Sequence, residues 1–340
     1  MRPEYSVGIS VLILGMLGGA WLLSLGKGHG EVPIITKDTP YVEIADPAGF
    51  VNTDGVTIGE LVGKKVILVE FLTYSCINCQ RTFPHVVSWY SKYKDEGLEI
   101  IGIHTPEFAF EKDINNVRAA MKKFGIEYPI VLDNNYATWN AYGNKYWPRK
   151  YLIDINGNIV YDHIGEGAYE ETEVKIRELL TKRAAFLGEG VGSDVRGSVE
   201  VVKEVKNAAQ SPETYFGSLR NTLLGNGKAG LEGTHSFTVP ALHTPNTLYL
   251  GGTWNVTPEY AESVANSRIV YQYHAQYVYL VMRSNTPASV EVWQDGVFVR
   301  TVVVQESQLY TLIENSNAKA HGLELRVKDP GLEVYAFTFG

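Results

Sequence analysis

The strongest constraint on the fold is a pair of cysteines placed between an apolar strand and a helix. Cys76 and Cys79, in Cys-x-x-Cys spacing, are the 2 cysteines of the chain. The β-branched segment 66–72 precedes them, and segment 80–94 carries apolar residues at helical spacing. We expect the helix to begin near Cys76, where free N–H groups and the helix dipole stabilise a thiolate. Cys76 is therefore the predicted nucleophile, and Cys79, one turn later, the predicted resolving thiol.

Two other roles for this pair are less well supported. A zinc site needs two further ligands, and no His-x₃-His pattern among the 8 histidines supplies them, so we predict no metal and no cofactor. A structural disulfide between residues so close in sequence closes too small a loop to add much stability. Two cysteines in 340 residues also exclude a four-thiolate iron–sulfur cluster and a disulfide-rich scaffold.

Glu70 is an ionisable residue within the otherwise apolar segment VILVEFL, residues 66–72. A carboxylate is costly to bury. With a raised pKa beneath the dithiol, Glu70 would accept the proton of Cys79 as that thiol attacks. The alternative is that Glu70 reaches a sheet edge or water.

Residues 46–187 alternate apolar β-like runs with amphipathic stretches. This alternation predicts an α/β domain, a sheet with helices on both faces. Asn156-Gly157 suits a two-residue hairpin turn between two of the strands. The expected strands are 66–72, 98–104, 129–132, 151–155 and 159–164, and the expected helices are 80–94, 114–124 and 170–186.

The sequence changes character after residue 187. Residues 188–234 are rich in Gly, Ser, Asn and Glu and predict a linker. Residues 235–340 contain short alternating runs with turn residues about every ten positions, which predicts an all-β sandwich or jelly roll. Asp295-Gly296 is a hairpin signal between two of these runs.

Aromatic residues of this β domain have two possible uses. Aromatic rings stack on the apolar faces of sugars, and Trp254 is the best candidate for an exposed platform. Four tyrosines at even spacing favour core packing instead, because alternate residues of a strand share one face. They are Tyr271, Tyr273, Tyr277 and Tyr279.

Residues 1–26 predict a transmembrane anchor or an export signal. Residues 6–25 carry no charged side chain and are long enough to cross about 30 Å of hydrocarbon as a helix. The run is longer than the apolar region of a secretory signal and lacks a small-x-small site, which favours an uncleaved anchor over a cleaved signal or a core helix. Either an anchor or a signal is expected to place the rest of the chain on the extracytoplasmic side. A Gly/Pro-containing tether is expected at 27–45. The net charge of −8 argues against a nucleic-acid partner.

Residues 46–187 resemble the thioredoxin fold, specifically the TlpA/ResA-type membrane-tethered thiol–disulfide oxidoreductases. Glu70, six residues before Cys76, matches the acid of that family, where Asp is more usual. Pro148, just before YLID, matches the position of the family's cis-proline. The resemblance implies a cis Trp147–Pro148 bond, which exposes the Trp147 backbone to pair with a client chain. From the residues alone, a trans proline is equally compatible.

The sequence departs from this family next to the cysteines. Ser75 stands where the family has an aromatic residue, and Ile77 and Asn78 lie between the cysteines without the common proline. We expect these three residues, with Trp147, to contact the client. They also influence the redox potential.

Separated blocks extend the resemblance to the soluble part of DipZ-like proteins, in which a thioredoxin-like domain is fused to a carbohydrate-binding-module-like jelly roll. The blocks are TYSCINCQRTFP at 73–84, IHTPEFAFEKD at 103–113, WPRKYLID at 147–154 and SPETYFG at 211–217. DipZ-like proteins carry a multi-span electron-conducting membrane domain of the CcdA type, whereas the present sequence predicts one span. If the protein is a reductant, the resemblance therefore implies a separate CcdA-like membrane donor. Cell-wall glycan is a possible ligand of the jelly roll.

These observations predict a thiol–disulfide oxidoreductase that acts on protein clients, with the reductant direction favoured. Two alternatives stay open. Thr73-x-x-Cys76 resembles the Thr-x-x-Cys of peroxiredoxins, in which threonine and arginine polarise a peroxide. The peroxiredoxin motif has a proline four residues before the threonine, and this position is Val69 here. In the other alternative, the β domain binds a glycan or partner and the dithiol is vestigial.

Overall fold

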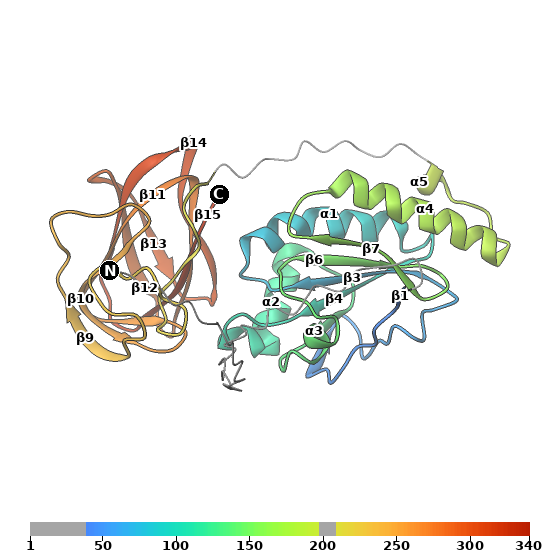
Figure 1. Ribbon diagram of the computed structural model, residues 1–340, viewed down its shortest axis with the longest axis horizontal. Coiled ribbons are helices and arrows are strands. Elements are labelled where there is room, and N and C mark those ends of the chain that lie inside the picture. Colours follow the sequence, from blue (N-terminus) through green and yellow to red (C-terminus); the bar gives the residue numbers. More distant parts are fainter. Residues whose placement is uncertain (1–38, 197–208) are drawn as a thin grey trace, which may run out of the picture. The chain divides into compact units, whose positions relative to one another are not determined.

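The computed structural model describes residues 39–196 and 209–340 as an α/β domain followed by an all-β domain (Figure 1). The expected anchor at residues 6–25 lies outside the described residues. Within those residues, no helix has both the length and the apolar character that a membrane span requires.

The α/β domain is built on a seven-stranded sheet in the order β1-β7-β6-β3-β4-β5-β2. Central β3 is parallel to β4 and antiparallel to β6. Every residue of β3 is buried because both faces of the sheet are covered. The strands are β1 (Thr39–Pro40), β2 (Gly49–Val51), β3 (Val66–Leu72), β4 (Leu98–His104), β5 (Ile130–Leu132), β6 (Arg149–Ile153) and β7 (Asn158–Ile164).

Helices cover both faces of this sheet, as the alternation predicts. The helices are α1 (Ile77–Tyr93), the 3-10 helix η1 (Ala109–Lys112), α2 (Ile114–Phe124), α3 (Ala137–Ala141), α4 (Tyr169–Leu187) and α5 (Ser193–Arg196). On one face, α1, α2 and α4 pack on Leu68, Leu72 and their neighbours. On the other face, Trp139 of α3 packs on Phe71. Figure 1 shows α1 and α4 on the same side of the sheet.

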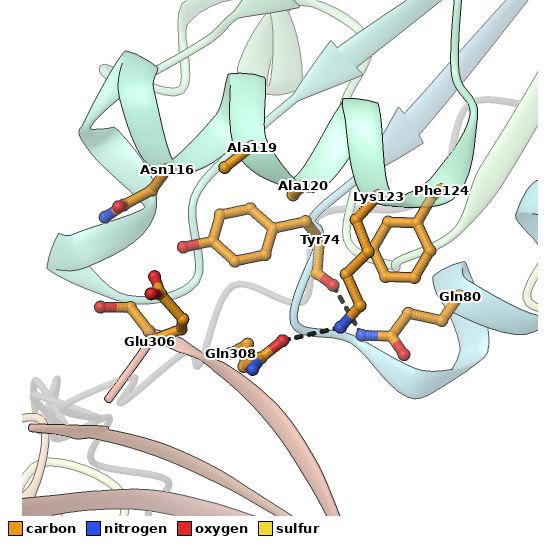
Figure 2. Close-up of a pocket in the computed structure, with 10 residues that line it drawn as sticks. Tyr74, Gln80, Asn116, Ala119, Ala120, Lys123, Phe124, Glu306 and Gln308 are labelled. Carbon is orange, nitrogen blue, oxygen red and sulfur yellow. Dashed lines mark hydrogen bonds between the residues drawn. The ribbon is translucent and has the colours of Figure 1, made fainter. Parts of the chain in front are cut away.

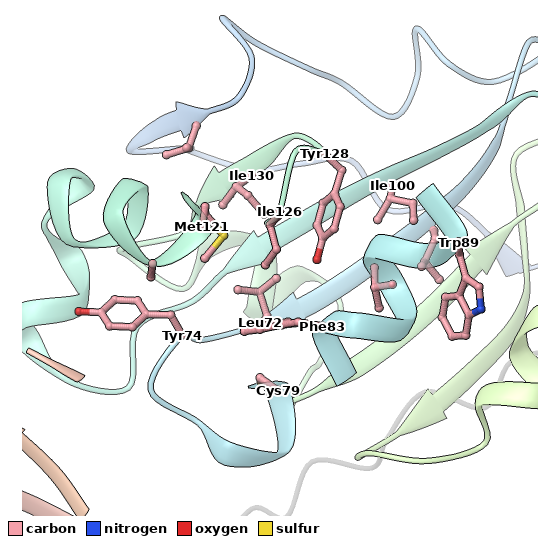
Figure 3. Packing of buried hydrophobic residues seen from close by; sticks show 14 of the residues in the cluster. Leu72, Tyr74, Cys79, Phe83, Trp89, Ile100, Met121, Ile126, Tyr128 and Ile130 are labelled. Carbon is pink, nitrogen blue, oxygen red and sulfur yellow. The ribbon is translucent and has the colours of Figure 1, made fainter. Parts of the chain in front are cut away.

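The core between α1, α2 and the sheet contains the side chain of Cys79 (Figure 3). Its other members include Leu72, Phe83, Met121 and Tyr128. Cys79 is therefore part of the hydrophobic core, and the end of α1 that carries it is fixed by packing.

The sequence predicts several elements at their observed bounds and misplaces one turn. The bounds of β3, β4 and α2 are those expected. The hairpin between β6 and β7 does not have a two-residue turn, because Asn156 lacks the positive φ that such a turn requires. Asp154 instead accepts hydrogen bonds from the backbone N–H groups of Asn156 and Asn158, at 3.0 and 2.8 Å, which stabilises a longer loop.

The all-β domain is one hydrogen-bonded sheet whose main path runs β13-β12-β14-β11-β10-β9. β15 pairs with β11 and β8, so the sheet includes residues from Thr214 onward, a region that the sequence places in a linker. Asp295 and Gly296 both have positive φ and form the expected tight turn. The strands are β8 (Thr214–Tyr215), β9 (Gly233–Phe237), β10 (Leu248–Val256), β11 (Ala261–Ser284), β12 (Ala288–Gln294), β13 (Val297–Val304), β14 (Gln308–Val327) and β15 (Leu332–Phe339).

Two expectations about aromatic residues in this domain are corrected. Trp254 is not an exposed platform: it is fully buried and donates its indole N–H to the Gly251 carbonyl at 2.9 Å. Tyr271 and Tyr273 are buried as expected, but Tyr277 and Tyr279 are only partly buried. The pairing of β11 with β14 shifts register between residues 275 and 277, and this irregularity changes which residues face the core.

Candidate active site

Cys76 and Cys79 lie at the N-terminus of α1. Cys76 is the N-cap residue, with extended backbone angles, and is partly exposed. Cys79 is fully buried one turn later. The first turn of α1 carries no acidic residue, so its free N–H groups and dipole act on Cys76 without a competing charge there. This asymmetry makes Cys76 accessible to a client and leaves Cys79 accessible only from within the protein.

The Cys79 thiol is held by its neighbours in the core. It lies in hydrogen-bonding contact with Cys76, and the backbone N–H of Thr73 hydrogen-bonds to its sulfur. Burial, reinforced by Cys76 and by the negative charge of Glu70, raises the pKa of Cys79 well above its ordinary value. Cys79 therefore needs a proton acceptor before it can attack.

Glu70 on β3 is the predicted acceptor. Burial raises its pKa from 4.5 to about 7, while the Lys150 ammonium and a hydrogen bond from Tyr128 oppose the rise. The Tyr128 hydroxyl donates to Glu70 Oε2 at 3.1 Å. Glu70 Oε1 is buried and has no hydrogen-bond partner among the described residues. A carboxylate with a pKa near neutrality and one unpartnered oxygen is suited to exchange a proton with a neighbouring thiol.

Lys150 is a fully buried lysine opposite Glu70. The two residues are direct partners in the antiparallel pairing of β3 with β6, which places their side chains on the same face of the sheet. The Lys150 ammonium donates to the Gly165 carbonyl at 3.4 Å and lies 5.6 Å from the centre of the Tyr169 ring. Its positive charge keeps the pKa of Glu70 near neutrality instead of higher.

Gly102 on β4 leaves the room that Tyr128 occupies. It is the partner of Glu70 on the other side of β3. A Cβ atom at this position would lie 2.5 Å from Ile130 Cδ1 and 3.2 Å from Tyr128 Cε2. Because residue 102 has no side chain, the Tyr128 hydroxyl can approach the carboxylate of Glu70.

The Trp147–Pro148 peptide bond is cis, as the resemblance implies. Pro148 directly precedes β6, which carries Lys150. The Trp147 ring is partly buried and packs on Trp139, with ring centres 4.3 Å apart. This packing fixes the backbone of Trp147, the predicted client-binding segment.

The three other predicted client-binding residues differ in their exposure. Asn78 is partly exposed, and its side-chain oxygen lies 3.5 Å from Arg81 Nη1. Residues Ser75 and Ile77, by contrast, are 1% and 7% exposed. Ser75 donates its hydroxyl to Glu111 at 2.7 Å. Contact between these two side chains and a client is therefore not supported: Ser75 is used internally, and Ile77 belongs to the core.

Thr73 and the buried Arg149 are not arranged to bind and polarise a peroxide at Cys76. Thr73 donates its hydroxyl to Glu111 at 2.5 Å. Arg149 pairs in register with Phe71, whose side chain belongs to the core on the face opposite Cys79. Its guanidinium is bound there by Asp162, at 2.5 Å, and stacks on Tyr151.

Sequence reasoning missed three residues of this site. Lys150 had a signal, since a lysine within a buried strand is as anomalous as Glu70. Glu111 lies in the block 103–113 that resembles DipZ-like proteins, but the local pattern does not distinguish it from a surface glutamate. Tyr128 had no signal, because its contact with Glu70 depends on how distant strands pair.

Known families match both domains. The family described as Redoxin matches residues 48–180, and the family described as Thioredoxin like C-terminal domain matches residues 211–340. Protein DipZ of Mycobacterium bovis is 40% identical over 296 residues, which are 86% of this chain and 41% of that protein. The chain thus spans about two fifths of the length of this relative.

Two further relatives concern the α/β domain. A solved thioredoxin-like protein in the oxidised form is 26% identical, covers 43% of this chain and 97% of its own, and has a TM-score of 0.40. Thiol-disulfide oxidoreductase ResA of Halalkalibacterium halodurans is 32% identical over 133 residues, which are 38% of this chain and 70% of ResA. The chain belongs to the family of thioredoxin-like thiol–disulfide oxidoreductases that includes ResA.

Proposed function

We propose that this protein is a membrane-anchored, extracytoplasmic oxidoreductase that reduces disulfides in client proteins. The observation that carries the proposal is the position of Glu70, a fully buried carboxylate with a pKa of about 7 beside a buried thiol. A purely structural dithiol would not require an ionisable group in the core, where it is costly.

The reaction proceeds in two exchanges. The Cys76 thiolate attacks one sulfur of a client disulfide, a mixed disulfide forms, and the other client sulfur leaves as a thiolate. Cys79 then transfers its proton to Glu70 and attacks the Cys76 sulfur. The Cys76–Cys79 disulfide forms and the second client sulfur leaves. The client gains two electrons, and the dithiol of the enzyme is oxidised.

The reductant direction rests on the DipZ resemblance, because DipZ-like proteins carry an electron-conducting membrane domain. A strong oxidant of this fold has an unusually stable thiolate on its nucleophilic cysteine, here Cys76, and this thiolate stabilises the reduced form. The potential of the Cys76–Cys79 pair therefore distinguishes the two directions. The test is the potential at equilibrium with glutathione: we expect a value near that of thioredoxin, about −270 mV, and a value near that of DsbA, about −120 mV, contradicts the proposal.

Client exchange is tested by trapping. A Cys79→Ser variant keeps the nucleophile but cannot resolve the mixed disulfide, so clients accumulate on Cys76. The Cys76→Ser variant is the matched control and traps nothing. Failure of Cys79→Ser to capture any client in cells would favour the alternative in which the dithiol is vestigial.

The anchor, the electron donor and the location are parts of the same proposal. The uncharged run at residues 6–25 supports an anchor, which would place the active site outside the cytoplasm. Removal of residues 1–26 should release the protein from the membrane fraction. The DipZ resemblance supports a CcdA-like membrane donor. Isolation of a mixed disulfide between Cys76 and a thiol of that donor would test this part of the proposal.

The β domain is proposed to bind a partner or a cell-wall glycan. Trp254 is buried, so a sugar platform must use other rings. Phe298 is 47% exposed and packs on Trp293, with ring centres 5.5 Å apart. Binding of purified cell-wall glycan that is lost in Phe298→Ala supports this role, and no binding by the full chain contradicts it.

A thiol peroxidase is the less well supported alternative, because Arg149 lies on the opposite face of the sheet from the dithiol core and Thr73 bonds to Glu111. Rapid consumption of hydroperoxide, with a sulfenic acid on Cys76, would favour the peroxidase instead.

A further inference from the structure

Glu111 is a buried carboxylate that holds the residues immediately before the dithiol. It lies in η1 and is fully buried. Its Oε1 atom accepts hydrogen bonds from the hydroxyls of Thr73 and Ser75, at 2.5 and 2.7 Å, and from the Ser75 N–H at 3.3 Å. Its Oε2 atom accepts from the N–H groups of Glu107 and Phe108, at 2.6 and 3.0 Å. One carboxylate thus ties the segment after β4 to the segment after β3.

Thr73 connects this carboxylate to both cysteines. Its carbonyl accepts a hydrogen bond from the Cys76 N–H at 3.4 Å. Its own N–H hydrogen-bonds to the sulfur of Cys79. Any movement of Thr73 therefore changes the positions of the groups that contact the nucleophile and the resolving thiol.

The segment is held from its other side by α1. Gln80 donates its side-chain amide to the Tyr74 carbonyl at 2.8 Å (Figure 2). Figure 2 also shows the Tyr74 side chain next to Ala119 and Ala120 of α2. With Gln80 on one side and Glu111 on the other, residues 73–75 have a fixed conformation.

We propose that Glu111 is a positioning residue for the second exchange: by holding Thr73 and Ser75, it keeps the Thr73 N–H directed at the sulfur of Cys79. The inference rests on the proposed role of Cys79 as the resolving thiol. When Cys79 gives up its proton, the Thr73 N–H stabilises the thiolate that attacks the Cys76 sulfur. Glu111 itself neither touches the client nor exchanges a proton in this step.

The aromatic disulfide DTNB separates the two exchanges in the full chain. Attack by Cys76 releases one thionitrobenzoate and leaves a mixed disulfide, and attack by Cys79 on the Cys76 sulfur releases the second. Stopped-flow absorbance in excess DTNB gives both rates. The reagent needs no client, so the measurement is independent of what the protein reduces in the cell.

We expect Glu111→Gln to slow the second release roughly tenfold relative to the first, which is the size of effect of one hydrogen bond to a charged group. The pH midpoint of the second release should also rise, because the Cys79 thiolate loses the Thr73 N–H. The other titratable groups that face Cys79 are Cys76, Glu70 and Tyr128, and the substitution does not alter them. Glu127→Gln is the matched control, because it removes the same charge from an exposed position and should leave both rates as they are.

Two substitutions at Thr73 complete the test. Thr73→Ser retains the hydroxyl donor to Glu111 and should keep the wild-type ratio of the two rates, whereas Thr73→Val removes the donor and should behave like Glu111→Gln. If Glu111→Gln does not fold, the ratio of the two release rates in the Thr73→Ser and Thr73→Val variants tests the proposal instead. A Glu111→Gln protein that melts at a lower temperature but keeps the wild-type rate ratio and pH midpoint overturns the proposal. If Cys79→Ser also releases two equivalents, the resolving role of Cys79 fails instead.

Discussion

Glu70→Gln should gain stability relative to the wild type as the pH rises through neutrality, although it removes the proposed proton acceptor. The pKa of this carboxyl is 4.5 in an ordinary setting and about 7 in the folded protein, chiefly because of burial. Between these two values, the folded state binds the proton and the unfolded state does not. The free energy of unfolding of the wild type therefore falls as pH rises through this window. Glutamine does not titrate, so the variant avoids this loss.

The magnitude follows from the two pKa values. A difference of about 2.5 in pKa corresponds to about 3 kcal/mol at 1.36 kcal/mol per pKa unit. Relative to the wild type, Glu70→Gln should thus gain about 3 kcal/mol between about pH 4 and pH 8. Any difference between the two side chains that does not depend on pH cancels when the two pH values are compared. The attraction of the ionised carboxylate to the Lys150 ammonium does depend on pH, and it is already contained in the pKa of about 7.

Urea unfolding at a series of pH values measures this change. Cys79 is fully buried and becomes reactive when the α/β domain unfolds, so a brief alkylation pulse at one fixed pH reports unfolding of this domain. Glu127→Gln, at an exposed carboxylate, should track the wild type within about 0.5 kcal/mol. If the stability difference between Glu70→Gln and the wild type changes by less than about 1 kcal/mol from pH 4 to pH 8, the reasoning about Glu70 is refuted.

Three further predictions concern the surroundings of Glu70. Lys150→Met removes the positive charge that lowers the pKa of Glu70, so the pH midpoint of the second DTNB release should rise; an unchanged midpoint contradicts this role. Tyr128→Phe removes the weaker hydrogen-bond contribution and should raise the same midpoint by less than Lys150→Met does. Gly102→Ala forces the side chains of Ile130 and Leu72 to move and should lower the free energy of unfolding in urea by about 1–3 kcal/mol, against little change for Gly55→Ala, where a Cβ meets no neighbour.

The sequence predicts the parts of this site that depend on local pattern. The apolar run of β3 and the helical spacing after Cys79 place the dithiol at a helix N-terminus, and the structure has Cys76 as the N-cap. Glu70 stands out because one carboxyl interrupts that run. These inferences need only neighbouring residues, because the periodicities of strands and helices are local properties.

The contacts of the site depend on strand order and register, which local pattern does not contain. Lys150 faces Glu70 because β6 pairs with β3, and this pairing brings together residues 80 positions apart. In the β domain, the prediction that alternate tyrosines share the core face is wrong for Tyr277 and Tyr279. These residues follow the register shift between residues 275 and 277, and such an irregularity changes the face of the residues after it.

Two of the buried carboxylates of the α/β domain, Glu70 and Glu111, show how the number of hydrogen-bond donors decides the use of one residue type. Burial raises the pKa of both Glu70 and Glu111. Among the described residues, Glu70 accepts one hydrogen bond, from Tyr128 at 3.1 Å, so protonation of its other oxygen breaks no contact. Glu111 accepts five hydrogen bonds, and a proton on either oxygen would displace at least one donor. The first carboxylate is therefore suited to take and return a proton, and the second is suited to hold the chain around the dithiol in one conformation.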